Sequence, residues 1–90
     1  MNLQETIKRT LRETKSGWGN STDKLSKTFN FNSFDDSIKF VNKVARIAEK
    51  QNHHPNITIK YDKVIISITD HEKGGISEKC HKFVDAVDKI

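Results

Sequence analysis

Three histidines in the second half of the chain are the residues best suited to chemistry. His53 and His54 stand side by side in "EKQNHHPNI", directly before Pro55, and His71 follows in "TDHEK". An imidazole has an unperturbed pKa of about 6.5, so at neutral pH one ring can donate a proton while another accepts one. Two neighbouring imidazoles also disfavour each other's protonation, which separates an acid from a base. The pattern is compatible with acid/base catalysis, and other interpretations of the same histidines stay open.

Glu49 lies one helical turn before His53 and could orient an imidazole or hold a polar group of a substrate. Two other interpretations use the same side chains. Histidines at a junction between a helix and a strand are often surface residues, and three histidines with Glu49 could bind zinc. Adjacent histidine side chains usually diverge, however, and the spacing His-Glu-x-x-His is absent. We therefore expect no metal ion at these residues.

The clearest predicted element is a helix over about residues 34–50, which ends at the histidine pair. Ser33 followed by Asp36 resembles a capping box at its start. Pro55 disfavours helical dihedral angles at His54, so the helix must end before or near the pair. Apolar residues at intervals of three or four predict one buried face. That face consists of Phe34, Ile38, Val41, Val44, Ala45 and Ala48.

The segment "NITIKYDKVIISITD" predicts a β-hairpin, because apolar and polar residues alternate on both sides of Asp62 and Lys63, a candidate two-residue turn. If Tyr61 pairs with Val64 across that turn, the ladder extends to place His54 opposite His71. Directly opposed residues have Cβ atoms roughly 5 Å apart. A slip of one residue would exchange His54 for His53, so we expect a histidine to face His71 in either register.

The remaining elements complete an α+β domain. A narrow apolar stripe predicts a helix over residues 3–14, and "KTFNF" alternates as a short strand. Ser77 is positioned to cap a last helix. The order predicts an antiparallel sheet of about four strands with helices packed on one face, and residues 1–90 as a single domain. The buried stripe of the last helix consists of Ile76, Cys80, Phe83, Val84 and Val87.

Composition limits the classes of function. The formal net charge is +4, but acids interrupt the basic residues, as in "DDSIKFVNK", which argues against nucleic-acid binding. A single cysteine excludes an intrachain disulfide. No signal peptide, transit peptide or membrane helix is recognisable, so a cytoplasmic location is expected. We expect Cys80 to be a small core residue rather than a nucleophile. We expect His81 to be a solvated residue of the last helix.

Two aromatic residues have more than one interpretation. Trp18 is the only tryptophan and lies between two glycines. Its ring could close the edge of the sheet or stack on a ligand, and the sequence favours neither. Tyr61, at the predicted turn, is more typical of a residue that stabilises a hairpin than of a site residue.

Several of these residues together resemble the pterin-4a-carbinolamine dehydratases. The resemblance lies in Glu49-x-x-x-His53-His54-Pro55, Tyr61 after five further residues, His71 after nine more, and "GGIS" at the opening of the last helix. The upstream "GW" and the Phe-rich strand extend it over roughly residues 16–90.

The resemblance implies an α+β fold that forms homodimers or homotetramers and an activity without metal or prosthetic group. Members of the family dehydrate 4a-hydroxytetrahydropterin to quinonoid dihydropterin. By this resemblance, His53, His54 and His71 would be catalytic, whereas Glu49 and Trp18 would support binding or orientation of the substrate.

Some family members also bind a homeodomain transcription factor, so an adaptor without catalysis is the alternative function. The sequence departs from the family at Cys80, where an aspartate three residues after the Ser or Thr that opens the last helix is usual. That aspartate resembles the far half of a capping box. We expect its loss to weaken the helix start by about 1 kcal/mol and to leave the site intact.

Overall fold

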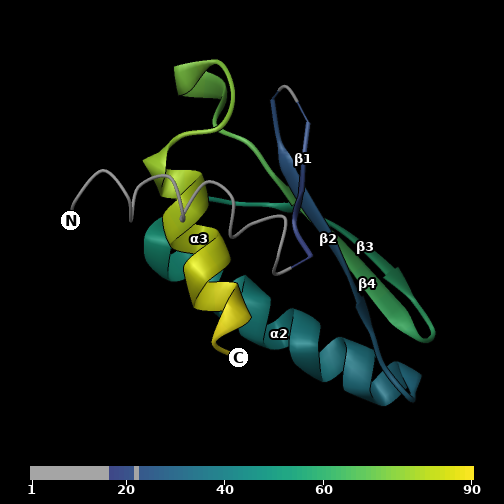
Figure 1. Ribbon diagram of the computed structural model, residues 1–90. Coiled ribbons are helices and arrows are strands. Elements are labelled where there is room, and N and C mark those ends of the chain that lie inside the picture. Colours follow the sequence, from purple (N-terminus) through teal and green to yellow (C-terminus); the bar gives the residue numbers. More distant parts are fainter. Residues whose placement is uncertain (1–16, 22) are drawn as a thin grey trace.

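The computed structural model describes residues 17–21 and 23–90, so the helix predicted over residues 3–14 lies outside the described residues. The described elements are β1 (Gly19–Asn20), β2 (Leu25–Asn30), α2 (Phe34–Gln51), β3 (Asn56–Lys60), β4 (Lys63–Ile68), the 3-10 helix η1 (His71–Lys73) and α3 (Glu78–Asp88). The strands form one antiparallel sheet in the order β1-β2-β4-β3. Both described α-helices lie on one side of this sheet (Figure 1). The predicted α+β class is confirmed.

One face of the sheet carries the apolar side chains that the helices cover. Along β4, Val64, Ile66 and Ile68 are buried, and the residues between them are more exposed. Leu25 pairs with Ile68 and Phe29 with Val64, so β2 contributes apolar side chains to the same face. The predicted alternation is therefore confirmed for β4.

The buried face of α2 differs in part from the predicted one. Phe34 is 54% exposed and Ala45 is also exposed, so both assignments to the core were wrong. Ser37 is buried, and its hydroxyl group is within hydrogen-bond distance of two carbonyl oxygens, those of Ser33 at 3.3 Å and Tyr61 at 3.4 Å. An apolar pattern does not reveal a polar residue whose hydrogen bonds are satisfied inside the core. The buried residues of α2 are Ser37, Phe40, Val44 and Ala48.

The hairpin forms, but its predicted register was wrong by two residues. Lys60 pairs with Lys63, which makes Tyr61 and Asp62 the turn, and Ile59 pairs with Val64. A shift of two residues keeps every side chain on its predicted face, so the hydrophobic pattern could not distinguish the two registers. A hydrogen bond from outside the hairpin favours the observed turn. The N–H of Phe31, which directly follows β2, donates to the carbonyl oxygen of Asp62 at 2.7 Å.

The end of α2 fixes the position of the histidine pair. Asn52 has a φ of 52° and caps the helix in the left-handed conformation, with its N–H directed at the carbonyl oxygens of Ala48 and Glu49. The His53 N–H also donates to the Ala48 carbonyl oxygen, at 3.1 Å. The expectation that the helix ends just before the pair is confirmed.

A closed loop carries His71. The N–H of Asp70 donates to the Gly75 carbonyl oxygen at 2.8 Å, and the N–H of Gly75 donates back to Asp70 at 3.0 Å. Gly74 has a φ of 72° and caps η1 in the left-handed conformation, which favours glycine. These hydrogen bonds close the loop between Asp70 and Gly75, and His71 lies within this closed loop.

The last helix begins where the sequence predicted, but the predicted side-chain capping hydrogen bond does not form. Ser77 is the N-cap residue of α3, yet its side chain makes no capping hydrogen bond. Ile76 precedes the cap and is partly buried against the core. The predicted buried residues Cys80, Phe83, Val84 and Val87 are confirmed. Within residues 17–21 and 23–90, none of the helices is both long and apolar enough to span a membrane.

We expect Asn52→Val to lower the free energy of unfolding by about 1–2 kcal/mol, because a β-branched side chain fits the left-handed conformation poorly. Asn52→Gly is the matched control and should be near neutral, since glycine adopts positive φ freely. Urea unfolding of the three proteins measures the difference. Equal stability of the Val and Gly variants would contradict this role of the turn.

Candidate active site

His53 points into the protein and contacts the only cysteine. His53 is 9% exposed and Cys80 is 0% exposed. The Nε2 atom of His53 lies 3.6 Å from Cys80 Sγ, within hydrogen-bond range for sulfur. Cys80 is a core residue, as predicted, but it is also the direct partner of a predicted catalytic histidine. The expectation that the Cys80 departure concerns only the helix cap was therefore wrong.

Asp70 and Ser77 extend this contact into a polar cluster. Asp70 is 5% exposed, and its Oδ2 accepts a hydrogen bond from the Ser77 hydroxyl at 2.6 Å. Ser77 Oγ in turn lies 4.0 Å from Cys80 Sγ. The side chain of Ser77 is thus directed at Asp70 and Cys80, which explains why it does not cap α3.

The cluster influences the charge of His53 and of Asp70. Burial lowers the pKa of His53, the negative charge of Asp70 raises it in part, and Lys79 and His54 lower it further. The hydrogen bond from Ser77 lowers the pKa of Asp70, which outweighs the opposing effect of burial. The two groups therefore favour a neutral imidazole near an ionised carboxylate.

Sequence reasoning missed Asp70 and Ser77 as site residues. The signal that could have found Asp70 is the hairpin register, since continuing the observed ladder beyond Asn56 and Ser67 places His53 opposite Asp70. The predicted register placed a histidine opposite His71 instead. The prediction that the ladder itself pairs two imidazoles was therefore wrong.

His54 and Glu49 lie outside the buried cluster. His54 Nε2 is 3.3 Å from Glu49 Oε1, and the side chains are 56% and 79% exposed. Glu49 thus contacts His54 rather than His53. Exposed pairs of this kind contribute little to stability because water screens them.

His71 is exposed on η1, directly after Asp70. Because Asp70 belongs to the buried cluster, His71 lies at the same end of the sheet as His53. The three histidines therefore differ in their surroundings: His53 is buried, whereas His54 and His71 face solvent.

Trp18 is part of the core. It is 0% exposed, and its ring packs edge-on against Phe29 with centroids 5.9 Å apart. Its Nε1–H donates to Asp88 Oδ1 at 2.9 Å. The fully buried ring offers no face for a ligand to stack on, so the substrate-binding role expected for Trp18 does not fit this position. The alternative, a ring that closes the sheet next to β1, does fit.

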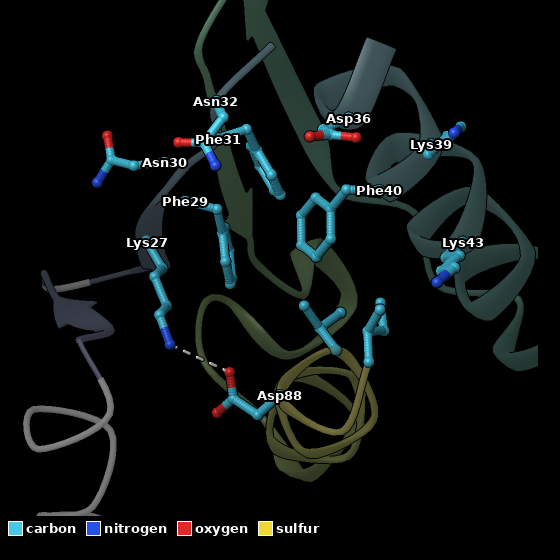
Figure 2. Close-up of a pocket in the computed structure, with 12 residues that line it drawn as sticks. Lys27, Phe29, Asn30, Phe31, Asn32, Asp36, Lys39, Phe40, Lys43 and Asp88 are labelled. Carbon is cyan, nitrogen blue, oxygen red and sulfur yellow. Dashed lines mark hydrogen bonds and ion pairs between the residues drawn. The ribbon is translucent and has the colours of Figure 1, made fainter. Parts of the chain in front are cut away.

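A pocket of about 610 Å³ lies away from the histidines. Phe29, Phe31 and Phe40 line it, and Lys27 and Asp88 form an ion pair at its rim (Figure 2). It opens near the start of α2 and the end of α3. About 16 Å of helix separates Phe40 from the end of α2 at Gln51. Among the described residues that line it, none is a histidine, a cysteine or another group that titrates near neutral pH, so this pocket is a poor candidate for acid/base chemistry.

Among the residues that the structure describes, no three His, Cys, Asp or Glu side chains gather closely enough to hold a metal ion. The zinc interpretation considered for His53, His54, His71 and Glu49 therefore has no assembled ligand set in this part of the chain.

Comparison with known proteins identifies the family of this chain. The family model described as pterin 4 alpha carbinolamine dehydratase matches residues 2–90. The chain belongs to the pterin-4a-carbinolamine dehydratase family. A relative from Sulfolobus acidocaldarius, named "Putative pterin-4-alpha-carbinolamine dehydratase", is 38% identical over 91 residues, which cover 100% of this chain and 99% of the relative. A relative of the same name from Herpetosiphon aurantiacus is 41% identical over 78 residues, 87% of this chain and 81% of the relative.

Two solved structures of pterin dehydratase-like proteins resemble the fold. The crystal structure of a transcriptional coactivator/pterin dehydratase from Brucella melitensis has a TM-score of 0.82 at 22% identity, covering 99% of this chain and 95% of that one. A pterin dehydratase-like protein described as a RuBisCO assembly factor in the alpha-carboxysome has a TM-score of 0.66 at 25% identity, covering 80% and 83%. The family resemblance predicted from the sequence is confirmed.

The free energy of unfolding should decrease as the pH falls below about 6.5, because the unfolded chain protonates His53 near its ordinary pKa of 6.5 whereas burial lowers that pKa in the folded state. Between these two pKa values the unfolded state binds more protons, so stability rises with pH. Urea unfolding at about pH 7.5 and about pH 5.5 measures the slope. His53→Gln should reduce the slope, and the control His71→Gln should retain it, since the charges that shift the pKa of His53 are those of Asp70, Lys79 and His54. An unchanged slope in His53→Gln would contradict the effect.

Proposed function

We propose that the protein dehydrates 4a-hydroxytetrahydropterin to quinonoid dihydropterin by histidine acid/base catalysis, in the recycling of tetrahydropterin. The observation that carries this proposal is a family match over nearly the whole chain, combined with a histidine, His53, held out of water beside two exposed ones. A buried imidazole is kept neutral and can accept a proton, while an exposed imidazole exchanges protons with solvent.

The reaction requires two proton transfers. A base removes the proton from a ring nitrogen of the pterin, the nitrogen lone pair forms a double bond to C4a, and the C4a–O bond breaks. An acid protonates the departing oxygen, so that water leaves and the charges balance. We assign His53 and His71 as the acid/base pair, and His54 as a neighbour that binds the substrate or relays a proton.

Glu49 supports this arrangement through its contact with His54, 3.3 Å away. A carboxylate that accepts a hydrogen bond from one ring nitrogen fixes the orientation of that ring. Trp18 does not contact the substrate in this proposal, because its ring is fully buried and its Nε1–H donates to Asp88.

The alternative function is that of an adaptor, and the relatives give it support. One structural relative is described as a transcriptional coactivator/pterin dehydratase and another as a RuBisCO assembly factor. An adaptor does not need three histidines at one end of the sheet, which is why we favour catalysis.

Either function is compatible with self-association. In the described sheet, β3 lies at the end of the strand order, with Ile59 41% exposed and Tyr61 74% exposed beside it. An edge strand with exposed apolar side chains is suited to pairing with another chain. We therefore expect a homodimer or homotetramer.

The decisive assay follows the decay of freshly generated 4a-hydroxytetrahydropterin with EDTA-treated protein. The wild type should accelerate the decay, and His71→Ala should lose about 10²-fold to 10⁴-fold of the acceleration, the range of a general acid or base. His81→Gln is the control, since His81 lies on α3 outside the proposed set.

A folded wild-type protein that does not accelerate the decay would contradict dehydration. If a stoichiometric protein partner were then recovered with it, the adaptor function would replace catalysis.

A further inference from the structure

Four side chains connect a carboxylate to the buried imidazole. Asp70 Oδ2 and Ser77 Oγ are 2.6 Å apart, Ser77 Oγ and Cys80 Sγ are 4.0 Å apart, and Cys80 Sγ and His53 Nε2 are 3.6 Å apart. Asp70, Cys80 and His53 are each at most 9% exposed, and Ser77 is partly buried. Little water competes for these contacts. The four side chains themselves therefore determine which atom carries each proton.

The carboxylate sets the direction of these hydrogen bonds. An ionised carboxylate can only accept, and a hydroxyl group has a single proton to give. Ser77 donates that proton to Asp70 in the short contact of 2.6 Å. In the longer contact with Cys80, Ser77 Oγ is therefore left as the acceptor and the thiol as the donor. This direction requires the sulfur to accept from the Nε2–H of His53 across the 3.6 Å contact.

This direction selects one tautomer of the imidazole. A neutral imidazole carries one proton, so a proton on Nε2 leaves the lone pair of Nδ1 free. Building on the proposed dehydration, we propose that Cys80 is a positioning residue that holds His53 through Nε2 and leaves Nδ1 to accept the proton from the pterin ring. His53 is then the base of the pair, and His71 is the acid.

The thiol suits this role because it is uncharged. A carboxylate in the place of Cys80 would lie close to the imidazole and favour its protonated form, which cannot act as a base. A thiol orients the ring without that charge. The carboxylate of Asp70 is separated from His53 by the side chains of Ser77 and Cys80. In this proposal the thiol orients His53 and leaves it neutral.

The tautomer can be measured directly in the wild-type protein. Long-range ¹H–¹⁵N correlation spectra of ¹⁵N-labelled protein at about pH 8, where a histidine is neutral, distinguish a protonated from an unprotonated ring nitrogen. We expect His53 to carry its proton on Nε2. A proton on Nδ1, or an equal mixture of the two tautomers, would overturn the proposal.

Asp70→Asn tests the direction of the chain. An amide keeps the oxygen that accepts from the Glu72 N–H but adds an N–H group that can donate to Ser77. Every hydrogen bond up to His53 can then reverse, so we expect the population with the proton on Nδ1 to rise. An unchanged tautomer in a folded Asp70→Asn protein would contradict transmission from Asp70 through Ser77 and Cys80.

Two substitutions at Cys80 test the link to activity. Cys80→Ser keeps a group that accepts from Nε2–H and donates to Ser77, so the tautomer should be retained and the rate should stay within about tenfold of the wild type. Cys80→Ala removes the partner, and we expect mixed tautomers with a rate lower by about 10-fold to 100-fold, as for other residues that orient a reactive histidine. A rate loss in Cys80→Ala without a change of tautomer would indicate a packing role only and overturn the proposal.

The outcomes separate the two proposals. An active protein with the proton of His53 on Nδ1 would retain the proposed dehydration and remove the role of Cys80. An inactive protein with the expected tautomer, reversed by Asp70→Asn, would retain the orientation of His53 and remove the proposed reaction.

Discussion

The left-handed turn at Asn52 is the constraint on which the candidate site depends. It ends α2 with a φ of 52°, and the next residue is tied to the helix by its N–H. From this point His53 is directed into the protein and His54 toward Glu49 on the outside. Pro55 then prevents the helix from continuing. One backbone turn therefore separates two adjacent histidines into a buried group and an exposed group, which gives them different chemistry.

A small core can accommodate the polar cluster because its members satisfy one another. Asp70 is nearly buried, but it accepts hydrogen bonds from the Ser77 hydroxyl and the Glu72 N–H. Its loop is closed by paired backbone hydrogen bonds with Gly75. Such a cluster fixes side-chain orientation, which the two proton transfers of the proposed dehydration would require.

The sequence was most informative where a local pattern decides the structure. Helix α2 was predicted over residues 34–50 and spans Phe34–Gln51, because its cap and its apolar period are local signals. The hairpin register failed because a shift of two residues leaves the hydrophobic pattern intact, and the choice rests on contacts with Phe31 and Ser37. The contact of Cys80 with His53 joins two helix ends that are distant in sequence, so no spacing rule could reveal it. The burial of Trp18 likewise depends on Asp88, far along the chain.

The aromatic pocket and the polar cluster that contains His53 lie at opposite ends of the helix layer, and they offer a ligand two different environments. The measurement that tests the account most directly is NMR titration of labelled protein with a stable pterin that lacks the 4a-hydroxyl group. We predict that the ring signals of His53, His54 and His71 shift together, while those of Phe31 and Phe40 do not. Shifts confined to Phe31, Phe40 and their neighbours would place the pterin in the aromatic pocket and contradict the histidine site.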